Sequence, residues 1–288
     1  MTTFWTTCEL RGLGKSAHEI RQAAAAGRIE PVRRGHWVVP GAAAEVVRAA
    51  RVGGVATATT ASRALGLWTP PDPEPGGDSF RRRRDRLQVA VASSCSRLRD
   101  PDDATRSLGV RRDVVVHYVA PDLLAGTGRT RIAGPLLLLS HVFTTQPPER
   151  ALAVLDSALH LRRIGERDLP ALAALLPAHL RPVLLAADGR ADSGIETIVR
   201  HLLRMRGLRI EVLPRLDGIG EVDLLVEGRL IIECDGREFH DDDEAFERDR
   251  GRDLRAAQGR YRVLRLTWPQ VLFAWAEVEE AVFAALAS

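Results

Sequence analysis

The chain has 288 residues, 45% of them hydrophobic and 27% charged, and its formal net charge is +3. This is enough for two or three globular domains, but no apolar run approaches the roughly 20 residues of a membrane span. The N-terminus lacks the features of a signal peptide, and three scattered cysteines argue against a disulfide framework or zinc motif, so we expect a cytoplasmic protein without a membrane partner.

The charges are unevenly distributed along the chain. Residues 1–112 hold 19 basic and 11 acidic residues, and the remainder holds 22 basic and 27 acidic residues. The asymmetry suggests a polyanion-binding part and a cation-binding part, unless surface charge has segregated by chance.

Residues 10–41 predict two short helices followed by a two-stranded hairpin. Ser16 is a good N-cap with Glu19 three residues later, which is the pattern of a capping box, and Gly27 ends that helix. Two short strands then surround Arg33-Arg34-Gly35 and close at Pro40-Gly41. The order of helix, turn, helix and basic wing predicts a winged helix.

In a winged helix the second helix enters a major groove, and the wing contacts phosphates. We therefore expect Arg21, Arg33 and Arg34 to bind DNA. The stretches "GLGKSAHEIRQAAAAGRIEPVRRGHWVVPG" and "VATATTASRALGLW" resemble the N-terminal winged-helix domain of the AbiEi-type antitoxin family. The segment before Leu10 is short for the first helix of that family, and winged helices also serve as protein–protein modules.

The middle of the chain predicts alternating strands and helices without a catalytic constellation. A Pro/Gly-rich loop with four consecutive arginines, residues 70–86, is a solvated loop or a phosphate contact. Strands are expected at "RLQVAVASS" and "VVVHYVAP", and helices at "IAGPLLLLSHVF", "PERALAVLDSALHL" and "RDLPALAALLPA". His117 and His141 lie in apolar stretches, which favours packed core histidines over metal ligands.

From residue 191 onward the pattern predicts the order α-β-β-β-α-β-α. An amphipathic helix presents an apolar stripe of Ile195, Ile198, Val199, Leu202 and Leu203. Ser193 and Glu196 form a second capping box, which accounts for Glu196 without chemistry. Strands are expected at "RIEVLPRL", "EVDLLVEG", "RLIIECDG" and "YRVLRLTW", a charged helix over 242–259, and a final helix at "PQVLFAWAEVEEAVFAALA".

Ten acids and only four arginines lie between Glu233 and Asp253. If residues 227–229 form a three-residue loop, Asp223 falls opposite Glu233, and Asp235 shares their face of the sheet. Carboxylates about 5 Å apart repel one another by roughly 3 kcal/mol at an effective dielectric near 20, so they must take up protons or hold a cation. Oxygen ligands favour Mg²⁺ or Mn²⁺. A two-residue loop would place Asp223 and Glu233 on opposite faces, and the metal hypothesis would fail.

The spacing of Asp223 and Glu233 in this element order resembles the PD-(D/E)XK nuclease fold. More closely, "EVDLLVEGRLIIECDGREFHDDDEAFERDRGRDLRAAQGRYRVLRLTW" resembles the very-short-patch-repair (Vsr)-like endonuclease domain. Asp235 stands where the parent superfamily has lysine, and Vsr-like enzymes use a nearby histidine, matched here by His240. The alternative for His240 is a solvent-facing residue at the start of a helix.

The resemblance implies Mg²⁺- or Mn²⁺-dependent hydrolysis of a DNA phosphodiester. Asp223, Glu233 and the backbone carbonyl of Cys234 would bind the metal, and His240 would act as general base. Asp235 would hold a second metal or orient His240. Further roles implied are metal binding for Glu196, stabilisation of phosphorane charge for Arg265, and phosphate positioning for Arg250 and Arg252.

We therefore expect an α/β (α+β) protein with a winged helix at 1–42, a mixed α/β middle region at 43–188 and a Vsr-like nuclease domain at 189–288. The main functional hypothesis is an endonuclease in DNA repair or phage defence that acts on double-stranded DNA, including mismatched or branched forms, and is compatible with a homodimer. The alternatives are a DNA-binding regulator or antitoxin with a non-catalytic nuclease fold, and an interaction protein of a defence cluster.

Overall fold

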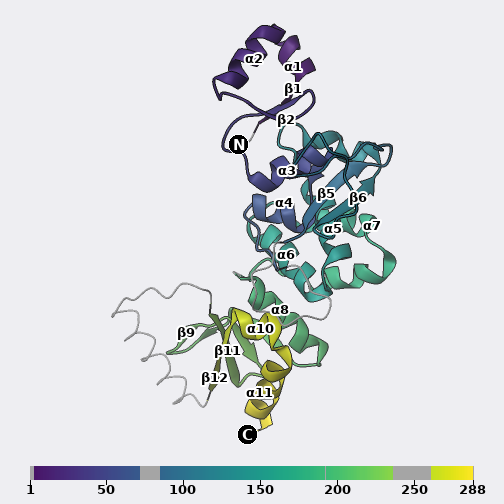
Figure 1. Ribbon diagram of the computed structural model, residues 1–288. Helices are drawn as coiled ribbons and strands as arrows, with labels where there is room; N and C mark the ends of the chain where they lie inside the picture. Colours follow the sequence, from purple (N-terminus) through teal and green to yellow (C-terminus); the bar gives the residue numbers. More distant parts are fainter. Residues whose placement is uncertain (1–2, 72–84, 192, 236–260, 288) are drawn as a thin grey trace. The chain divides into compact units, whose positions relative to one another are not determined.

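The computed structural model describes residues 3–71, 85–191, 193–235 and 261–287. Its contacts divide the chain into two compact units, one of residues 1–146 with 168–176 and one of 147–167 with 177–288. The predicted division at residues 42 and 188 stays a prediction about folding domains. Helices combine with open sheets in both units, so the α/β class is confirmed (Figure 1).

The first unit begins with the predicted helix–turn–helix and wing. Its elements are β1 (Phe4–Thr6), α1 (Thr7–Gly12), α2 (Ala17–Ala25), β2 (Glu30–Arg33) and β3 (His36–Val38). The Ser16–Glu19 capping box is present. The Ser16 N–H donates to the Glu19 carboxylate at 2.8 Å, and the Glu19 N–H donates to the Ser16 hydroxyl oxygen at 3.2 Å. Strand β1, which the sequence patterns did not predict, pairs antiparallel with β3 and gives the sheet order β1-β3-β2.

A second sheet with helices completes the first unit. Its elements are α3 (Ala44–Val52), β4 (Val55–Ala56), α4 (Ala58–Ala64), β5 (Leu87–Ala92), β6 (Val114–Val119), the 3₁₀ segment η1 (Pro121–Thr127), α5 (Pro135–Thr145) and α7 (Leu169–Leu175). Strands β5 and β6 are parallel, and β4 pairs antiparallel with β5. The expected middle strands and helices are confirmed. Helices α3 and α4 were not predicted, because both are short and rich in alanine, although Val46, Ala49 and Ala50 of α3 have helical spacing and are buried.

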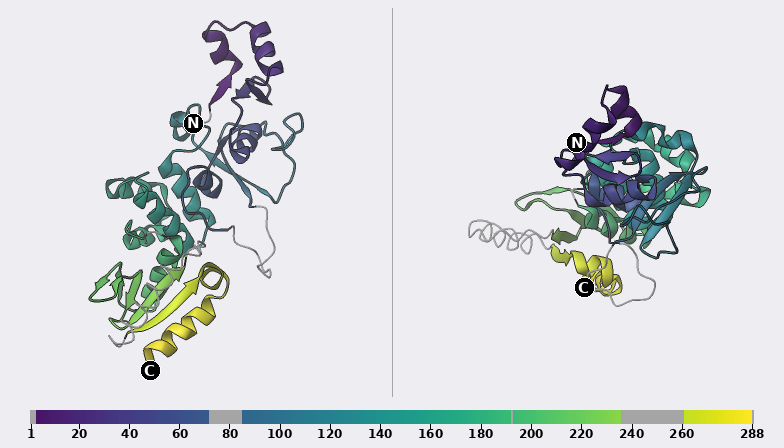
Figure 2. Two further views of the ribbon diagram at one scale, coloured as in Figure 1. Left: turned by 90° about the vertical axis from the view of Figure 1, so that its left-hand side faces the viewer. Right: turned by 45° about the horizontal axis from the view of Figure 1, so that its top comes forward.

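The second unit contains the predicted α-β-β-β start of the C-terminal core. Its elements are α6 (Pro148–His160), the 3₁₀ segments η2 (Glu166–Asp168) and η3 (Ala178–Ala186), α8 (Gly194–Met205), β7 (Ile210–Val212), β8 (Arg215–Leu216), β9 (Gly220–Glu221), β10 (Leu224–Val226), β11 (Leu230–Asp235), β12 (Arg262–Thr267), α10 (Trp268–Phe273) and α11 (Trp275–Ala287). The four-stranded sheet has the order β12-β11-β10-β7, with β11 and β12 parallel. Figure 2 shows α11 running beside β12.

Three expected elements are interrupted. Leu213 takes a left-handed conformation (φ 51°) before Pro214, so "RIEVLPRL" is split into β7 and β8, and "EVDLLVEG" is likewise split into β9 and β10. The expected final helix is two helices, because Ala274 leaves the helical conformation (φ −130°) and the Leu272 carbonyl accepts a hydrogen bond from the Arg150 side chain (3.2 Å). The charged helix expected over 242–259 lies outside the described residues.

Within the described ranges, every helix is too short or too polar to cross a bilayer.

Candidate functional site

The hairpin of β10 and β11 has the three-residue loop on which the metal hypothesis depends. Val226 pairs with Leu230, and Leu224 pairs with Ile232, leaving residues 227–229 as the loop. Glu227 (φ 50°) and Gly228 (φ 68°) are both left-handed, which is the geometry of the tight turns that join twisted strands. The alternative two-residue loop is therefore excluded.

This register determines which side chains share a face of the sheet. Leu225 and Ile231 lie opposite each other in a small apolar cluster, and Val263 of β12 packs against it. Because side chains alternate along a strand, Glu233, two residues after Ile231 in β11, lies on the same face as Ile231. The paired residues end at Leu224 and Ile232, and Asp223 lies in a bend just before β10.

Asp223 is half-buried and held against the neighbouring strand. Its Oδ2 atom accepts a hydrogen bond from the backbone N–H of Cys234 at 2.7 Å, and its carbonyl oxygen accepts one from the N–H of Leu213 at 3.0 Å. A hydrogen bond to a carboxylate is stronger than one between neutral groups. The carboxylate of Asp223 is thus fixed at the edge of β11, beside the half-buried Glu233.

Arg265 lies next to Glu233 in the parallel ladder. Glu233 pairs in register with Arg265 of β12, so both side chains leave the same face of the sheet. Arg265 is exposed. A guanidinium there can approach an anion bound on the acidic face.

Asp223 and Glu233 fit a hard divalent cation by the chemistry of their oxygens. Over the described part of the chain, however, no three His, Cys, Asp or Glu side chains gather closely enough to hold a metal, so the structure does not bring Glu196 into a shared group with Asp223 and Glu233. Asp235 is the last residue of β11, and its side chain is not described. His240, Arg250 and Arg252 lie outside the described residues.

Glu196 has the structural role that its position predicts. Its side chain is 4% exposed, and its Oε1 atom accepts the N–H of Ser193 at 3.0 Å. The Ser193 hydroxyl in turn accepts the N–H of Glu196 at 3.3 Å, which completes the capping box of α8.

The three arginines expected to bind DNA lie in the helix–wing region of the first unit. Arg21 is exposed on α2, and Arg34 is exposed at the tip between β2 and β3. Arg33 is half-buried, and its guanidinium approaches Gly53 so closely that a Cβ atom on Gly53 would collide with Nη1.

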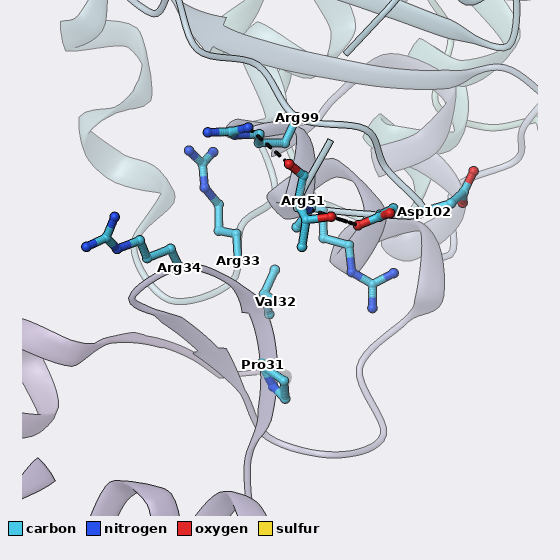
Figure 3. A pocket seen from close by; sticks show the side chains of 10 residues that line it. Pro31, Val32, Arg33, Arg34, Arg51, Arg99 and Asp102 are labelled. Atoms are coloured by element: carbon cyan, nitrogen blue, oxygen red, sulfur yellow. Dashed lines mark hydrogen bonds between the residues drawn. The ribbon is translucent and has the colours of Figure 1, made fainter. Parts of the chain in front are cut away.

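Two arginines that no sequence motif indicated join this wing. Arg51 and Arg99 line the same hollow as Arg33 and Arg34 (Figure 3). They belong to α3 and to a loop 48 residues further along the chain. Only tertiary folding brings these residues together, which explains why no local sequence pattern indicated them.

His117 and His141 form a stacked pair, with ring centroids 4.1 Å apart. His117 Nε2 is 2.8 Å from Gln88 Oε1, and His141 Nδ1 is 2.8 Å from Thr57 Oγ1. Burial lowers the pKa of His117 to about 4, and burial together with the neighbouring His117 lowers the pKa of His141 to about 3. Both are therefore neutral packed histidines at pH 7.

Neither the models of known protein families nor the curated proteins with which the sequence was compared match this chain.

Proposed function

We propose that this chain is a metal-dependent DNA endonuclease whose helix–wing region binds the duplex. The observation that carries the proposal is the contact of Asp223 with β11, where its carboxylate accepts the backbone N–H of Cys234 at 2.7 Å, one residue after Glu233. The order α-β-β-β with a following β-strand parallel to β11, and the Vsr-like motif around these acids, support the same reaction class.

Two acids at this spacing are costly unless something neutralises them. Opposed residues of adjacent strands are about 5 Å apart, where two carboxylates repel by roughly 3 kcal/mol at an effective dielectric near 20. The Cys234 N–H, which holds Asp223, and Arg265, which pairs in register with Glu233, offset part of that cost. A cation between Asp223 and Glu233 would offset the rest, and Mg²⁺ or Mn²⁺ is the best match to carboxylate oxygens.

When bound, such a cation polarises the scissile phosphate and lowers the pKa of a bound water. The chain's own residues would hold the cation, bind the phosphate and accept the proton of the attacking water. Asp223 and Glu233 would hold the cation, and Arg265 would bind a non-bridging phosphate oxygen. His240 takes the proton of the attacking water, whose oxygen forms the new P–O bond as the bond to the leaving sugar oxygen breaks. The products are a phosphomonoester and a free hydroxyl.

Nicking of supercoiled plasmid tests the proposal. The protein is incubated with DNA and Mg²⁺ or Mn²⁺, and wild type is compared with Asp223→Asn and Glu233→Gln. Asparagine keeps an oxygen that can accept the Cys234 N–H, so Asp223→Asn removes charge with little change to the fold. The matched control is Glu280→Gln, an exposed acid on α11. We expect EDTA and both site variants to abolish nicking and the control to retain it. Nicking by Asp223→Asn at the wild-type rate would refute the assigned site.

A DNA-binding regulator with a non-catalytic nuclease fold is the second candidate. The observation in its favour is that the side chains of Arg33 and Arg34 have no hydrogen bond or ion pair with any described residue, and can therefore bind phosphates whether or not the chain hydrolyses DNA. Binding to one duplex sequence that survives Asp223→Asn, without any nicking, would favour this function.

A further inference from the structure

A hollow of about 490 Å³ lies between β2, the end of α3 and the loop at residues 99–105 in the first unit. Its lining residues are Pro31, Val32, Arg33, Arg34, Arg51, Arg99, Asp102, Asp103, Ala104 and Thr105. Figure 3 shows the guanidinium groups of Arg33, Arg34 and Arg99 turned to the same side of the hollow and that of Arg51 turned to the other side. Four arginines and two aspartates thus share one small space.

The two aspartates are neutralised by arginines that do not line the hollow. Asp102 pairs with Arg48 at 2.8 Å and with Arg111 at 3.1 Å. Asp103 pairs with Arg106 at 3.1 Å and also accepts hydrogen bonds from the hydroxyl and N–H of Thr105. Little of their negative charge is left for the arginines of the hollow.

The four arginines of the hollow have no carboxylate partner among the described residues. Arg51 donates to the carbonyl of Pro101 at 3.4 Å, and Arg99 donates to the carbonyl of Thr105 at 3.3 Å. Neutral carbonyls orient these guanidinium groups but leave their charge uncompensated. Four like charges around one hollow repel one another, and an anion placed among them removes that repulsion.

The shape of the hollow helps to select the anion. A planar guanidinium binds phosphate through two parallel N–H···O bonds, which makes arginine the preferred residue for phosphate recognition. Gly53, at the end of α3, has φ 120° and no Cβ, so the Arg33 guanidinium can lie against its backbone at the wall of the hollow. The volume is in the range of ligand sites, about 300–1,000 Å³.

We propose that this hollow binds backbone phosphate of a nucleic-acid strand, with Arg51 and Arg99 adding to the contacts made by the wing residues Arg33 and Arg34. The inference rests on the DNA-binding part of the proposed function but is independent of hydrolysis. It extends the DNA-binding surface from the helix–wing region to the end of α3 and the loop at residues 99–105.

The test is DNA binding by the full chain in EDTA, where nuclease chemistry cannot contribute. Fluorescence anisotropy of a labelled 20-base-pair duplex is measured over a series of NaCl concentrations for wild type and Arg51→Gln/Arg99→Gln. The matched control is Arg97→Gln/Arg112→Gln, which removes two exposed arginines of the same unit that do not line the hollow. We expect the hollow variant to raise Kd about tenfold or more and the control to change it less than threefold.

Salt dependence reports the phosphate contacts themselves. Each phosphate contact that is lost lowers the magnitude of the slope of log K against log salt by about 0.9. We therefore expect the slope of the glutamine variant to be smaller by about one to two units than that of wild type. Arg51→Lys/Arg99→Lys keeps the charge and should keep the slope, with weaker binding than wild type. Equal binding by the hollow variant and the control would overturn the proposal, as would equally weak binding by the lysine and glutamine variants, which would show a structural role.

A phosphate group also occurs on small free compounds, and the test has to distinguish these from a nucleic-acid strand as the ligand of the hollow. Thymidine 5′-monophosphate is therefore titrated against the protein by calorimetry. Binding of the mononucleotide that is lost in Arg51→Gln/Arg99→Gln, while duplex affinity is unchanged, would assign the hollow to small phosphate compounds and overturn the strand assignment. DNA that binds through the hollow without being cut leaves this inference standing and refutes only the endonuclease.

Discussion

The stacked histidines predict a loss of stability in mild acid. His117 and His141 have pKa values lowered to about 4 and about 3, chiefly by burial, whereas an unfolded histidine has a pKa near 6.5. Below pH 6.5 the unfolded chain takes up protons that the folded chain does not. Stability that is fully present above pH 6.5 is therefore lost as the pH falls toward 4.

The size of the effect follows from the width of that window. For each pH unit between the folded and the unfolded pKa, the free energy of unfolding falls by about 1.4 kcal/mol per histidine. Between pH 7 and pH 5 each ring would cost about 2 kcal/mol, and since solvent still reaches part of each ring we expect a total of about 2–4 kcal/mol for the pair. This is a large share of the roughly 5–15 kcal/mol that stabilises a typical domain.

Urea unfolding at pH 7, 6 and 5 measures this loss, with the His117→Asn/His141→Asn variant as the comparison. Asparagine does not titrate but can still hydrogen-bond with Gln88 and Thr57. All other histidines are common to both proteins, so their contributions cancel in the difference. We expect the variant to lose about 2–4 kcal/mol less than wild type between pH 7 and pH 5. The same pH dependence in both proteins would refute the assignment of neutral, buried rings.

Two further substitutions test the packing of the two units. Asp156→Asn removes the carboxylate that faces Arg200 at 2.5 Å, where both side chains are 1% exposed, and leaves Asp188, at 3.1 Å, as the partner of Arg200. The substitution should lower the free energy of unfolding by about 1–3 kcal/mol in urea unfolding, less than the cost of an unpaired buried charge; an unchanged free energy of unfolding would contradict this. Gly54→Ala places a Cβ against the carbonyl oxygen of Ala90 and should lower the free energy of unfolding by about 1–3 kcal/mol or more. Its control, Gly12→Ala, has open space around the added Cβ and should keep the wild-type melting temperature. Equal melting temperatures of the two variants would contradict this.

Local chemistry made several elements predictable from the sequence. Each capping box joins residues three positions apart, so Ser16 with Glu19 and Ser193 with Glu196 could be recognised without knowing the fold. The hairpin was less certain, because both a two-residue and a three-residue loop fit the sequence. The observed pairing of Val226 with Leu230 decides between them.

Features that depend on tertiary contacts could not be predicted. The broken strand at Leu213-Pro214 has strand-like apolar residues on both sides; Pro214 was a local signal for a break, but the pairing of β8 with β9 depends on tertiary structure. The final helix is broken where a distant side chain, Arg150, binds the carbonyl of Leu272. Arg33 and Arg99 are 66 residues apart in the sequence, and nothing near either of them indicates the other.

The pairing of charges, rather than their number, separates structural from candidate functional residues in this chain. The first 112 residues carry a clear excess of arginine, but Arg48, Arg106 and Arg111 are occupied with Asp102 and Asp103. Four of the arginines that remain once these pairs are subtracted line one hollow.

A comparison of their contacts likewise distinguishes Glu196 from Asp223 in the second unit. Glu196 is buried and caps α8, so its position is explained by the helix alone. Asp223 has no helix to cap, and its carboxylate reaches β11 next to Glu233, where it accepts the N–H of Cys234. Two carboxylates close together repel each other, so a chain selected only for stability would gain by replacing one of them. Asp223 and Glu233, and not Glu196, are therefore the acids whose removal should abolish the proposed nicking.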